Sequence, residues 1–501
     1  MIKAGWKKKF ESLTIYHIMV VGFLLRLMAA IFSKGYAFYD DHFDVVELAQ
    51  KWRDGVSFYW MEGPVYNVSL LYPGIHYLLF GACEKLGITE PQDIMFITRL
   101  FHGLLSLFSI YYAYKFSLRL SPNKNTSLII AWLMAVFWVF PFMSVHSLRE
   151  FVCIPFLMIG SYHIADPRST NRSLMLAGFF FAIAYCFRIQ TVFISGGIGL
   201  FMLFQRAQFK NSIKFGLAFI LSYFLTQGLF DFLHYGNPFA STIAYFKFNA
   251  NPVNIGVQPQ GPWYQYIGTV AGVVFGFSFF PLAWGYFTSI RISKITALFF
   301  AASLLFFAFH SYYSNKQERF IFPFIPYFLI LGVTGFQYYY EKNSNRVWLR
   351  KSMLFILGWF LLFNTIGLLM VTFTYSKRSR VEAMSYLRKK NDVDNIILEY
   401  ARSPSQLPLY YLGKHLNYFM LSPEKSTADL KIEIDTSSSP KPNYVIMVDK
   451  SNFEKRLQRL RELYPDIKAE TIVKPSTVDA IVFSLNPKHN PNETLYIYKL
   501  F

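Results

Sequence analysis

The segment Tyr39-Asp40-Asp41-His42-Phe43-Asp44-Val45-Val46-Glu47 places four carboxylates within eight residues. It closely follows Thr14–Phe32, an apolar run with the length of about 20 residues that a membrane-spanning helix needs. A chain embedded in a bilayer has little reason to carry so much negative charge beside the membrane unless the charge is used. The alternative is a solvated helix N-terminus, where the helix dipole favours Asp. The segment therefore predicts either an acidic functional site or a helix start directly after the first membrane span.

The composition is typical of an integral membrane protein. Hydrophobic residues make up 53% of the 501 residues and aromatic residues 20%, whereas only 16% are charged. The net charge of +19 does not indicate nucleic-acid binding, because most Lys and Arg residues lie in short connections between apolar runs. The three cysteines, two of them inside apolar runs, indicate neither a disulfide framework nor a metal-binding cluster.

About eleven apolar segments are predicted to be transmembrane helices. They are Thr14–Phe32, Ile94–Leu118, Ser127–Met143, Phe151–Ile164, Leu174–Phe187, Thr191–Phe204, Ile213–Phe232, Tyr266–Phe287, Ile295–His310, Phe320–Tyr338 and Met353–Thr374. Arg26 within the first segment, and the lack of a small-residue cleavage site after it, favour a retained helix over a signal peptide. The shorter patch Tyr72–Phe80 is predicted to form an interfacial or re-entrant helix.

Charge in the connections orients the predicted helices. Five basic turns are assigned to the cytoplasm: Arg119–Lys124, Asp166–Arg172, Arg206–Lys214, Arg291–Lys294 and Lys342–Lys351. The other connections then lie on the outer face, namely Lys34–Asp93, Phe142–Glu150, the tight turn at Arg188, Asp231–Pro262 and Ser311–Arg319. The acidic segment is thus expected on the outer face.

From Ser376 the composition changes to that of a soluble protein. The predicted strands are Asn395–Tyr400, Tyr444–Val448, Ala480–Ser484 and Thr494–Lys499, and a helix is predicted over Asn452–Leu463, where apolar residues recur at helical spacing. We therefore divide the chain into a membrane domain, residues 1–375, and a small α/β domain, residues 376–501. The odd number of predicted spans places the second domain on the outer, extracytoplasmic face.

A second charged motif, Lys316-Gln317-Glu318-Arg319, precedes a predicted span on the outer face, against the usual distribution of positive charge. Lys or Arg at a helix end can be a snorkelling anchor, but two cations together with Gln and Glu better suit the binding of a phosphate. Arg188 lies between two short spans and is costly there unless it faces a cavity or a partner. Asp40 and Asp41 suit a general base that acts on a hydroxyl, or a hard metal ion.

Four stretches, in this order along the chain, resemble motifs of glycosyltransferase family 22, the dolichyl- or polyprenyl-phosphate-mannose-dependent α-mannosyltransferases. Asp40–Ala49 is similar to the family's Asp-Glu-x-Phe-x-x-x-Glu-Pro-Ala motif, and Leu71-Tyr72-Pro73 to its Ser-Tyr-x-Tyr-Pro segment. The stretch from Asp231 to Tyr264 is similar to the family's Asp…Tyr-Gly…Phe-x-x-Phe-Asn…Pro-Trp-x-x-Tyr block. Asn315–Pro323 resembles its signature His-Lys-Glu-x-Arg-Phe-x-x-Pro. The resemblance covers roughly Thr14 to Tyr338.

The chain departs from the family pattern at several positions. Asn315 stands where the family has His, and Gln317 stands where it has Glu. The family's Pro-Trp-His-Trp-Tyr run is reduced here to Pro262-Trp263-Tyr264-Gln265-Tyr266. These departures leave the fold intact and leave the donor sugar and the acceptor open.

The resemblance implies an α-helical polytopic membrane enzyme of the GT-C type, which inverts the anomeric centre of the sugar in one displacement. Asp40 would be the general base, and Asp41 would orient the acceptor or tune Asp40. Lys316 and Arg319 would stabilise the departing lipid phosphate. The other residues assigned to substrate binding are Asp44, Glu47, Arg188, His234, Tyr235, Trp263, Tyr264, Gln317 and Glu318, with Trp263 and Tyr264 stacking on a sugar.

The expected reaction moves a sugar, first of all mannose, from a polyprenyl- or dolichyl-phosphate carrier to a hydroxyl of a glycan or glycolipid. No cofactor and no resident metal is expected, and the expected partners are the bilayer, the lipid-linked donor and the acceptor, with no nucleic acid. The alternatives are another GT-C transferase, of the protein O-mannosyltransferase or aminoarabinose-transferase type, and a transporter or flippase for a lipid-linked sugar. We expect a bacterial inner membrane as the location, with the endoplasmic reticulum membrane as the alternative.

Overall fold

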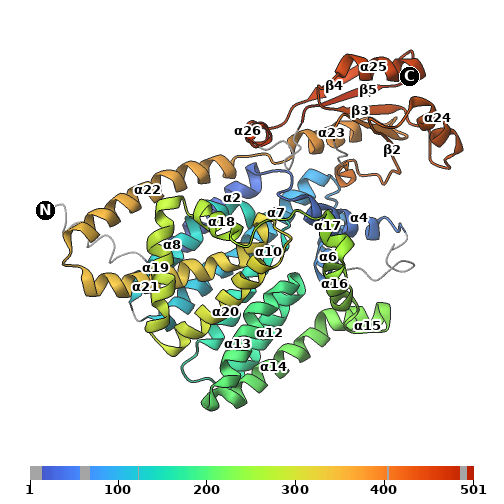
Figure 1. The fold of residues 1–501 in the computed structure, drawn as a ribbon. Coiled ribbons are helices and arrows are strands. Elements are labelled where there is room, and N and C mark those ends of the chain that lie inside the picture. The colour runs from blue at the N-terminus through green and yellow to red at the C-terminus, as the bar shows by residue number, and fades with distance from the viewer. Residues whose placement is uncertain (1–13, 57–67, 122, 403–405, 486–492) are drawn as a thin grey trace. The chain divides into compact units, whose positions relative to one another are not determined.

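The computed structural model describes residues 14–56, 68–121, 123–402, 406–485 and 493–501 (Figure 1). The contacts among its residues divide the chain into two compact units. The first, here called the helical unit, comprises Met1–Ala30, Ser57–Ile75 and Thr98–Thr372. The second, the mixed unit, comprises Ile31–Val56, His76–Ile97 and Phe373–Phe501. The mixed unit thus takes in two segments from the first hundred residues, whereas the sequence suggested one division after residue 375.

Helices account for nearly all of the regular structure before residue 373. In chain order they are α2 (Ile15–Phe32), α3 (Tyr39–Asp41), η1 (His42–Glu47), α4 (Leu48–Arg53), α6 (Leu71–Lys85), α7 (Pro91–Leu120), α8 (Lys124–Val136), α9 (Val139–Met143), α10 (Arg149–Val152), α11 (Ile154–Ile164), α12 (Asn171–Phe187), η2 (Ile189–Thr191), α13 (Val192–Phe204), η3 (Arg206–Gln208), α14 (Phe209–Tyr223), η4 (Phe224–Gly228), α15 (Leu229–Tyr235), α16 (Ala240–Ala250), α17 (Pro252–Val257), α18 (Gln265–Val273), η5 (Gly276–Ser278), α19 (Phe279–Thr288), η6 (Ser289–Arg291), α20 (Lys294–Tyr312), η7 (Glu318–Phe324), α21 (Ile325–Asn343) and α22 (Val347–Thr372). The predicted helix over Tyr72–Phe80 is confirmed as part of α6.

Six helical stretches of the described chain are long and apolar enough to cross a membrane: Ile15–Phe32, Pro91–Leu120, Phe209–Tyr235, Lys294–Tyr312, Glu318–Asn343 and Val347–Thr372. A seventh span would consist of Gln265–Val273 and Gly276–Arg291, which are bent by 105° at their junction. These seven coincide with seven of the predicted spans. The predicted total of about eleven is not confirmed, because the other four apolar segments form short or broken helices.

Length explains the difference in number. Helix α12 has 17 residues and α13 has 13. At 1.5 Å per residue they reach about 26 Å and 20 Å, less than the ~30 Å hydrocarbon core of a bilayer. The predicted span Ser127–Met143 breaks at Phe137 into α8 and α9, and Phe151–Ile164 holds only the end of α10 and the 11 residues of α11. Since the parity of the span count decides on which side the C-terminal residues lie, their outer placement stays a prediction.

Side chains of α22 stabilise two of the helix breaks. The Asn364 amide accepts a hydrogen bond from the Trp138 backbone N–H at 2.9 Å and donates one to the Val136 carbonyl at 2.9 Å, across the break between α8 and α9. At the bend after α18, the Trp359 indole donates to the Phe275 carbonyl at 2.7 Å. Backbone groups freed at a helix break within an apolar layer need such partners. The breaks are therefore features of the fold and not frayed ends.

Four of the predicted cytoplasmic turns meet within the helical unit. Each contributes a residue to the lining of a cavity of about 240 Å³, namely Arg119, Asp166, Gln208 and Lys294. Turns assigned to one side of a membrane have to lie at the same end of the helices. The arrangement therefore agrees with the predicted alternation of the connections.

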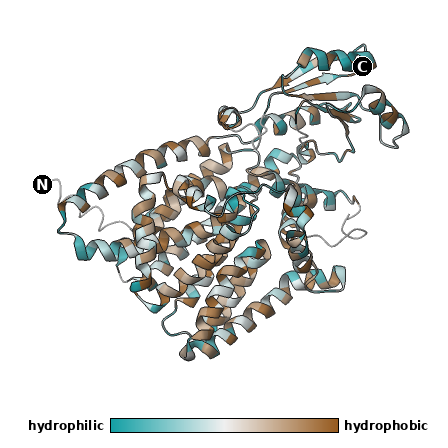
Figure 2. Cartoon of the chain, in the orientation of Figure 1, coloured by the Kyte–Doolittle hydropathy of each residue, from teal (hydrophilic) through white to brown (hydrophobic). Residues whose placement is uncertain are grey.

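Exposed apolar residues cover much of the helical unit. Figure 2 shows that apolar residues predominate along its helices, while polar and apolar residues are mixed in the segments after residue 376. Only 6% of the residues in the most apolar 18-residue stretch of α22 are buried. The Leu354 and Leu369 side chains of this helix are 71% and 56% exposed. An apolar surface of this extent is expected to contact lipid.

The C-terminal part of the mixed unit contains a five-stranded sheet with the strand order β2-β1-β3-β5-β4. Its elements are α23 (Arg378–Arg388), β1 (Ile396–Tyr400), η8 (Leu409–Tyr411), β2 (Phe419–Leu421), α24 (Thr427–Thr436), β3 (Tyr444–Val448), α25 (Phe453–Leu463), β4 (Lys468–Val473), α26 (Thr477–Leu485) and β5 (Leu495–Lys499). Strand β1 is parallel to β2 and β3, and β5 is antiparallel to β3 and β4. Buried apolar side chains of β1 and β3 contribute to a core on each face of the sheet.

Most of the predicted elements of this sheet are confirmed. Three predicted strands appear as β1, β3 and β5, and the predicted helix appears as α25. The predicted strand Ala480–Ser484 is wrong, because these residues belong to α26. A short apolar run does not distinguish a strand from a buried helix by its periodicity, and here the Ser476 hydroxyl accepts a hydrogen bond from the Asp479 N–H at the start of the helix. Strands β2 and β4 were not predicted, β2 having only three residues.

Arg26 shows how the first span accommodates a charge. Its buried guanidinium donates hydrogen bonds to Ser106 Oγ at 2.6 Å and to the carbonyls of Gly22, Met134 and Ala135 at 3.1–3.2 Å. Met134 and Ala135 lie in the last turn of α8, where backbone carbonyls lack partners within the helix. Arg26 therefore caps α8 and ties it to α2 and α7.

The substitution Arg26→Met is expected to lower the free energy of unfolding by about 3 kcal/mol, because charge-assisted hydrogen bonds are lost and carbonyls remain without a partner in apolar surroundings. Thermal unfolding of the purified protein in detergent measures the effect as a lower Tm. Arg26→Lys keeps the charge and should have a smaller effect. An unchanged Tm in Arg26→Met would contradict the capping role.

Candidate functional site

The acidic segment is helical and belongs to the mixed unit. Asp40 and Asp41 lie in the first turn of α3, which continues as η1, a turn of π-helix. Turns of π-helix are rare in proteins, and those that occur are often found at functional sites. Asp40 is exposed, Asp44 is half-buried, and Asp41 is only 3% exposed. The two adjacent carboxylates therefore lie in different environments, and both the helix-start and the functional interpretation suit this geometry.

Glu47 and His42 anchor the acidic segment within the mixed unit. Glu47 Oε1 accepts a hydrogen bond from the Tyr410 backbone N–H at 2.8 Å, and His42 Nε2 lies 3.4 Å from the same oxygen. The His42 ring stacks on the rings of Tyr36 and Tyr411, with centroid distances of 4.3 Å and 5.7 Å. One oxygen of Glu47 is thus used to hold the π-turn against η8.

In the helical unit, the Lys316-Gln317-Glu318-Arg319 motif lies between α20 and α21, beside a second motif that resembles the family. The Lys316 backbone N–H donates to the Pro259 carbonyl at 2.8 Å, and the Gly261 N–H donates to the Ser314 carbonyl at 3.2 Å. These bonds pair the two loops antiparallel at Gln260 and Asn315. Two motifs that are far apart in the sequence are thereby held side by side.

The Lys316 ammonium caps the end of α20. Its Nζ donates to the carbonyls of His310 at 2.6 Å and Ser311 at 2.8 Å and also to that of Tyr313, and it lies 5.2 Å from the centre of the Tyr266 ring. An ammonium has three donors, and the negative end of the helix dipole favours its charge here. Burial lowers the pKa of Lys316 below its usual value. Because all three donors are used, this geometry does not provide the predicted contact between Lys316 and a phosphate.

Two arginines and one glutamate form a buried ion cluster in the helical unit. Arg188 Nη2 lies 3.1 Å and Arg319 Nε 3.8 Å from Glu150 Oε1. The two guanidinium groups lie 4.6 Å and 5.6 Å from the centre of the Phe320 ring, and Arg319 Nε also donates to Gln317 Oε1 at 2.9 Å. The Nε and Nη2 of Arg188, although buried, donate no hydrogen bond to any residue that the structure describes. One carboxylate thus lies between two guanidinium groups, and charges interact strongly where water is excluded.

Each member of the cluster stands where a helix begins or ends. Glu150 is in α10, a helix of four residues, Arg188 follows the last residue of α12, and Arg319 is in the 3₁₀-helix η7. The sequence placed Glu150 on the same face as Arg188 but assigned it no role. Only the fold brings α10, α12 and η7 together, so the pairing had no local signal.

Polar groups next to the cluster are also fixed by hydrogen bonds. The Gln190 amide donates to the Tyr245 hydroxyl, and burial raises the pKa of Tyr245 to about 12, so this phenol stays neutral. The Tyr266 hydroxyl donates to the Gln317 carbonyl at 3.1 Å. Gln317, which stands where the family has Glu, therefore contacts Arg319 with its side chain and Tyr266 with its backbone.

Asp231 has a structural role at the turn between α15 and α16. It is fully buried, and its carboxylate accepts hydrogen bonds from Gln227 Nε2 at 2.5 Å and from the Ser241 hydroxyl and backbone N–H at 2.8 Å. Gln227 belongs to η4, a second turn of π-helix. The predicted substrate residues His234 and Tyr235 end α15, half-buried, with ring centres 4.5 Å apart.

The remaining predicted substrate residues are accessible. Trp263 and Tyr264 are 67% and 58% exposed, and their rings lie edge to face at 5.8 Å just before α18. Glu318 is exposed at the start of η7. Among the residues that the structure describes, no three His, Cys, Asp or Glu side chains are grouped to hold a metal ion.

Comparisons with known proteins identify the family. Residues 17–407 match the Alg9-like mannosyltransferase family. The chain is similar to GPI mannosyltransferase 3 of Debaryomyces hansenii, with 21% identity over 405 residues, which are 77% of this chain and 70% of the relative. It is also similar to GPI mannosyltransferase 3 of Yarrowia lipolytica, with 22% identity over 326 residues, 62% of this chain and 60% of that protein.

Solved structures with a similar fold include ArnT from Cupriavidus metallidurans bound to undecaprenyl phosphate, with a TM-score of 0.62 and 11% identity over 99% of this chain and 98% of that one. The Archaeoglobus fulgidus oligosaccharyltransferase in complex with zinc and sulfate has a TM-score of 0.56 and 11% identity, covering 89% of this chain and 69% of that one. At this identity the likeness concerns the fold, which is that of GT-C enzymes. Because the family match extends over residues 17–407, the chain belongs to the Alg9-like mannosyltransferase family and is an integral membrane glycosyltransferase.

Proposed function

We propose that the chain transfers mannose from a polyprenyl- or dolichyl-phosphate carrier to a hydroxyl of a glycan or glycolipid. Membership of the mannosyltransferase family supports the reaction class. The observation that carries the assignment of a donor site is the ion cluster, where Arg188 and Arg319 share the Glu150 carboxylate and the buried Nε of Arg188 donates no hydrogen bond within the described chain. Guanidinium groups bind phosphate oxygens in paired hydrogen bonds, so a phosphate ester suits this cluster well.

In the proposed reaction the acceptor oxygen attacks the anomeric carbon while the bond from that carbon to the phosphate oxygen breaks. Asp40, which is exposed, takes the proton of the acceptor hydroxyl. The electron pair of the broken bond stays on the lipid phosphate, and Arg188 and Arg319 stabilise the negative charge that grows there. A single displacement inverts the anomeric centre, so a β-linked donor yields an α-mannoside.

The other assigned residues divide into substrate contacts and positioning groups. Asp41 and Asp44 are proposed to orient the acceptor, and the exposed rings of Trp263 and Tyr264 to stack on a sugar. His234, Tyr235 and Glu318 are retained as substrate residues on the strength of their motifs alone. Lys316, Gln317 and Glu47 are proposed to act through others, since each holds a carbonyl, a guanidinium or a backbone N–H.

A glycolipid is the acceptor to test first, because both relatives carry the name GPI mannosyltransferase 3. The two relatives come from yeasts, so the expected preference for a bacterial inner membrane is not supported. The assignment is therefore to an integral membrane protein without a stated compartment.

Replacing the proposed base tests the acceptor half of the site. Asp40→Asn should lower the rate of transfer from labelled polyprenyl-phosphate-mannose by roughly 10²–10⁴-fold, because the amide cannot accept the acceptor proton. Asp54→Asn removes the carboxylate that directly follows α4, outside the acidic segment. This variant is the matched control and should transfer normally. If Asp40→Asn transfers at the wild-type rate, the base is not Asp40, and Asp41 and Asp44 are the next candidates.

Replacing one arginine of the cluster tests the donor half. Arg188→Gln should lower kcat/KM for the lipid donor by roughly 10²-fold or more, since one of two cations facing the departing phosphate is lost, while KM for the acceptor stays unchanged. Arg168→Gln removes a guanidinium that is 79% exposed beside Asp166 and serves as the control. An equal loss in both variants, or an effect on acceptor KM alone, would remove Arg188 from the donor site.

A further inference from the structure

A cavity of about 530 Å³ lies in the C-terminal sheet of the mixed unit, apart from every residue assigned above. Its lining consists of Glu399, Tyr400, Ala401, Arg402, Pro423, Ser451, Asn452, Lys455, Arg456 and Arg459. These residues follow or end the parallel strands β1, β2 and β3 or belong to the first turns of α25. The volume is within the range of about 300–1,000 Å³ typical of small-molecule sites.

The topology of the sheet explains why a cavity forms there. From β1 the chain passes to β2 on one side, and it then returns through α24 to β3 on the other side of β1. The connections that leave β1 and β3 therefore separate at the carboxyl ends of these strands. A crevice at such a point is the usual place for a ligand in an open sheet with parallel strands.

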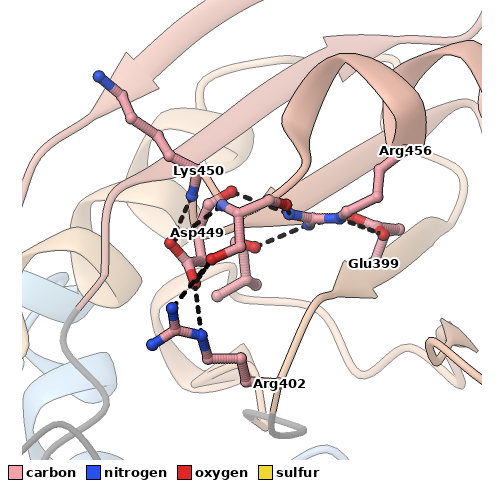
Figure 3. A network of polar contacts seen from close by, with 7 residues as sticks. Glu399, Arg402, Asp449, Lys450 and Arg456 are labelled. Carbon is pink, nitrogen blue, oxygen red and sulfur yellow. Dashed lines mark hydrogen bonds and ion pairs between the residues drawn. The ribbon is translucent and has the colours of Figure 1, made fainter.

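One side of the cavity is a rigid ion pair. The Arg456 guanidinium is buried and donates to both carboxylate oxygens of Glu399, with a distance of 2.7 Å between Nε and Oε1 (Figure 3). It also donates to the carbonyls of Val448, Asp449 and Ser451. All of its nitrogens are thus engaged, and the charge of Glu399 is compensated. The pair shapes the cavity and leaves ligand recognition to the other side chains.

The remaining charged groups of the lining are all cations. Arg402 Nε lies 3.4 Å from Asp449 Oδ2, and Arg459 uses one nitrogen to donate to the Lys425 carbonyl at 2.7 Å. Lys455 is exposed and has no ion pair or hydrogen bond to any residue in the described part of the chain. Arg402 and Arg459 also keep guanidinium nitrogens beyond these contacts, since each group has five N–H donors. Arg402 is thus compensated by Asp449, whereas Lys455 and Arg459 bring positive charge to the cavity without an ion pair in the described part of the chain.

Neutral polar and aromatic groups lie next to these cations. The Asn452 side chain and the Tyr400 ring belong to the same lining. So does the Ser451 hydroxyl, which donates to Asp449 Oδ2 at 3.0 Å and accepts from Arg402 Nη2 at 3.1 Å. Hydroxyl and amide groups bind sugar hydroxyls, and an aromatic ring packs against the apolar face of a sugar. Cations beside such groups suit a ligand that joins a phosphate to a polyhydroxylated ring.

We propose that this cavity, between the ends of β1 and β3 and the start of α25, binds a phosphate-bearing sugar or inositol headgroup, with Lys455, Arg402 and Arg459 holding the phosphate. None of its lining residues is assigned to the transfer reaction, so the site would give the enzyme a second point of recognition. Both a lipid headgroup and a free sugar phosphate can provide such a phosphate on a polyhydroxylated ring.

Binding to the full-length protein in detergent tests the proposal by isothermal titration, with glycerophosphoinositol and mannose 6-phosphate as the two probes and unphosphorylated inositol and mannose as references. Wild type should bind at least one phosphorylated probe saturably, and the probe that binds more tightly identifies the source. Lys455→Glu and Arg402→Glu should each weaken this binding by about tenfold or more, because the phosphate then meets a carboxylate.

Two controls separate this site from other sites on the protein. Arg461→Glu makes the same kind of charge change on the same helix, α25, outside the cavity lining, and should bind within about twofold of wild type. Arg188→Gln, which alters the proposed donor site, should also leave the binding unchanged. Loss in Arg188→Gln with no loss in Lys455→Glu, no saturable binding of either phosphorylated probe at millimolar concentration, or equal binding of the unphosphorylated references would each overturn the proposal.

Discussion

The Glu150 carboxylate lies 3.1 Å from Arg188 and 3.8 Å from Arg319, and this buried contact holds three helix ends of the helical unit in place. Charges in an apolar interior persist only with a partner of opposite charge or a full set of hydrogen bonds. The helical unit meets this requirement repeatedly. Arg26 is satisfied by carbonyls of α2 and α8 together with Ser106, and Lys316 by the carbonyls that end α20. Arg188 differs, because its buried Nε donates no hydrogen bond within the described chain, and a ligand is the natural partner for this nitrogen.

Helix breaks are where this protein concentrates its polar chemistry. Asp44, Glu47 and Gln227 lie in π-turns, Arg188 directly follows a short helix, and Arg319 lies in a 3₁₀-helix. Non-helical backbone at membrane depth is tolerated only where other groups satisfy it, as Asn364 does at the break after α8. Short helices thus reduce the number of complete spans and at the same time create positions where side chains can meet a substrate.

The sequence predicted those parts of the fold that depend on local pattern. Seven of the predicted apolar runs, three strands of the sheet and helix α25 all carry their own periodicity or length signal. The break between α8 and α9 is bridged by Asn364, and the bend after α18 is contacted by Trp359, so no local window of sequence contains these partners. Likewise, the apolar run at Ala480–Ser484 becomes a helix through its N-terminal cap, which the apolar residues do not reveal.

The candidate site was predictable in its residue types but not in its pairings. Arg188 was selected because a cation between two short spans is costly, and Arg319 because its charged motif on the outer face suits a phosphate. The structure places both beside one carboxylate. Glu150 had no such signal, since a glutamate at a helix start is ordinary. Lys316 was expected to meet a phosphate, but its three donors face the end of α20, which only the path of the backbone could reveal.

We propose that a lipid phosphate, and not a nucleotide, carries the mannose. The most direct test gives the purified full-length protein a mannosylated glycolipid acceptor and, in separate reactions, radiolabelled polyprenyl-phosphate-mannose or radiolabelled guanosine-diphosphate-mannose. We expect label to pass to the acceptor from the lipid donor alone and the new linkage to have the inverted, α configuration. Transfer from the nucleotide donor alone, or a β-mannoside formed from a β-linked lipid donor, would contradict it.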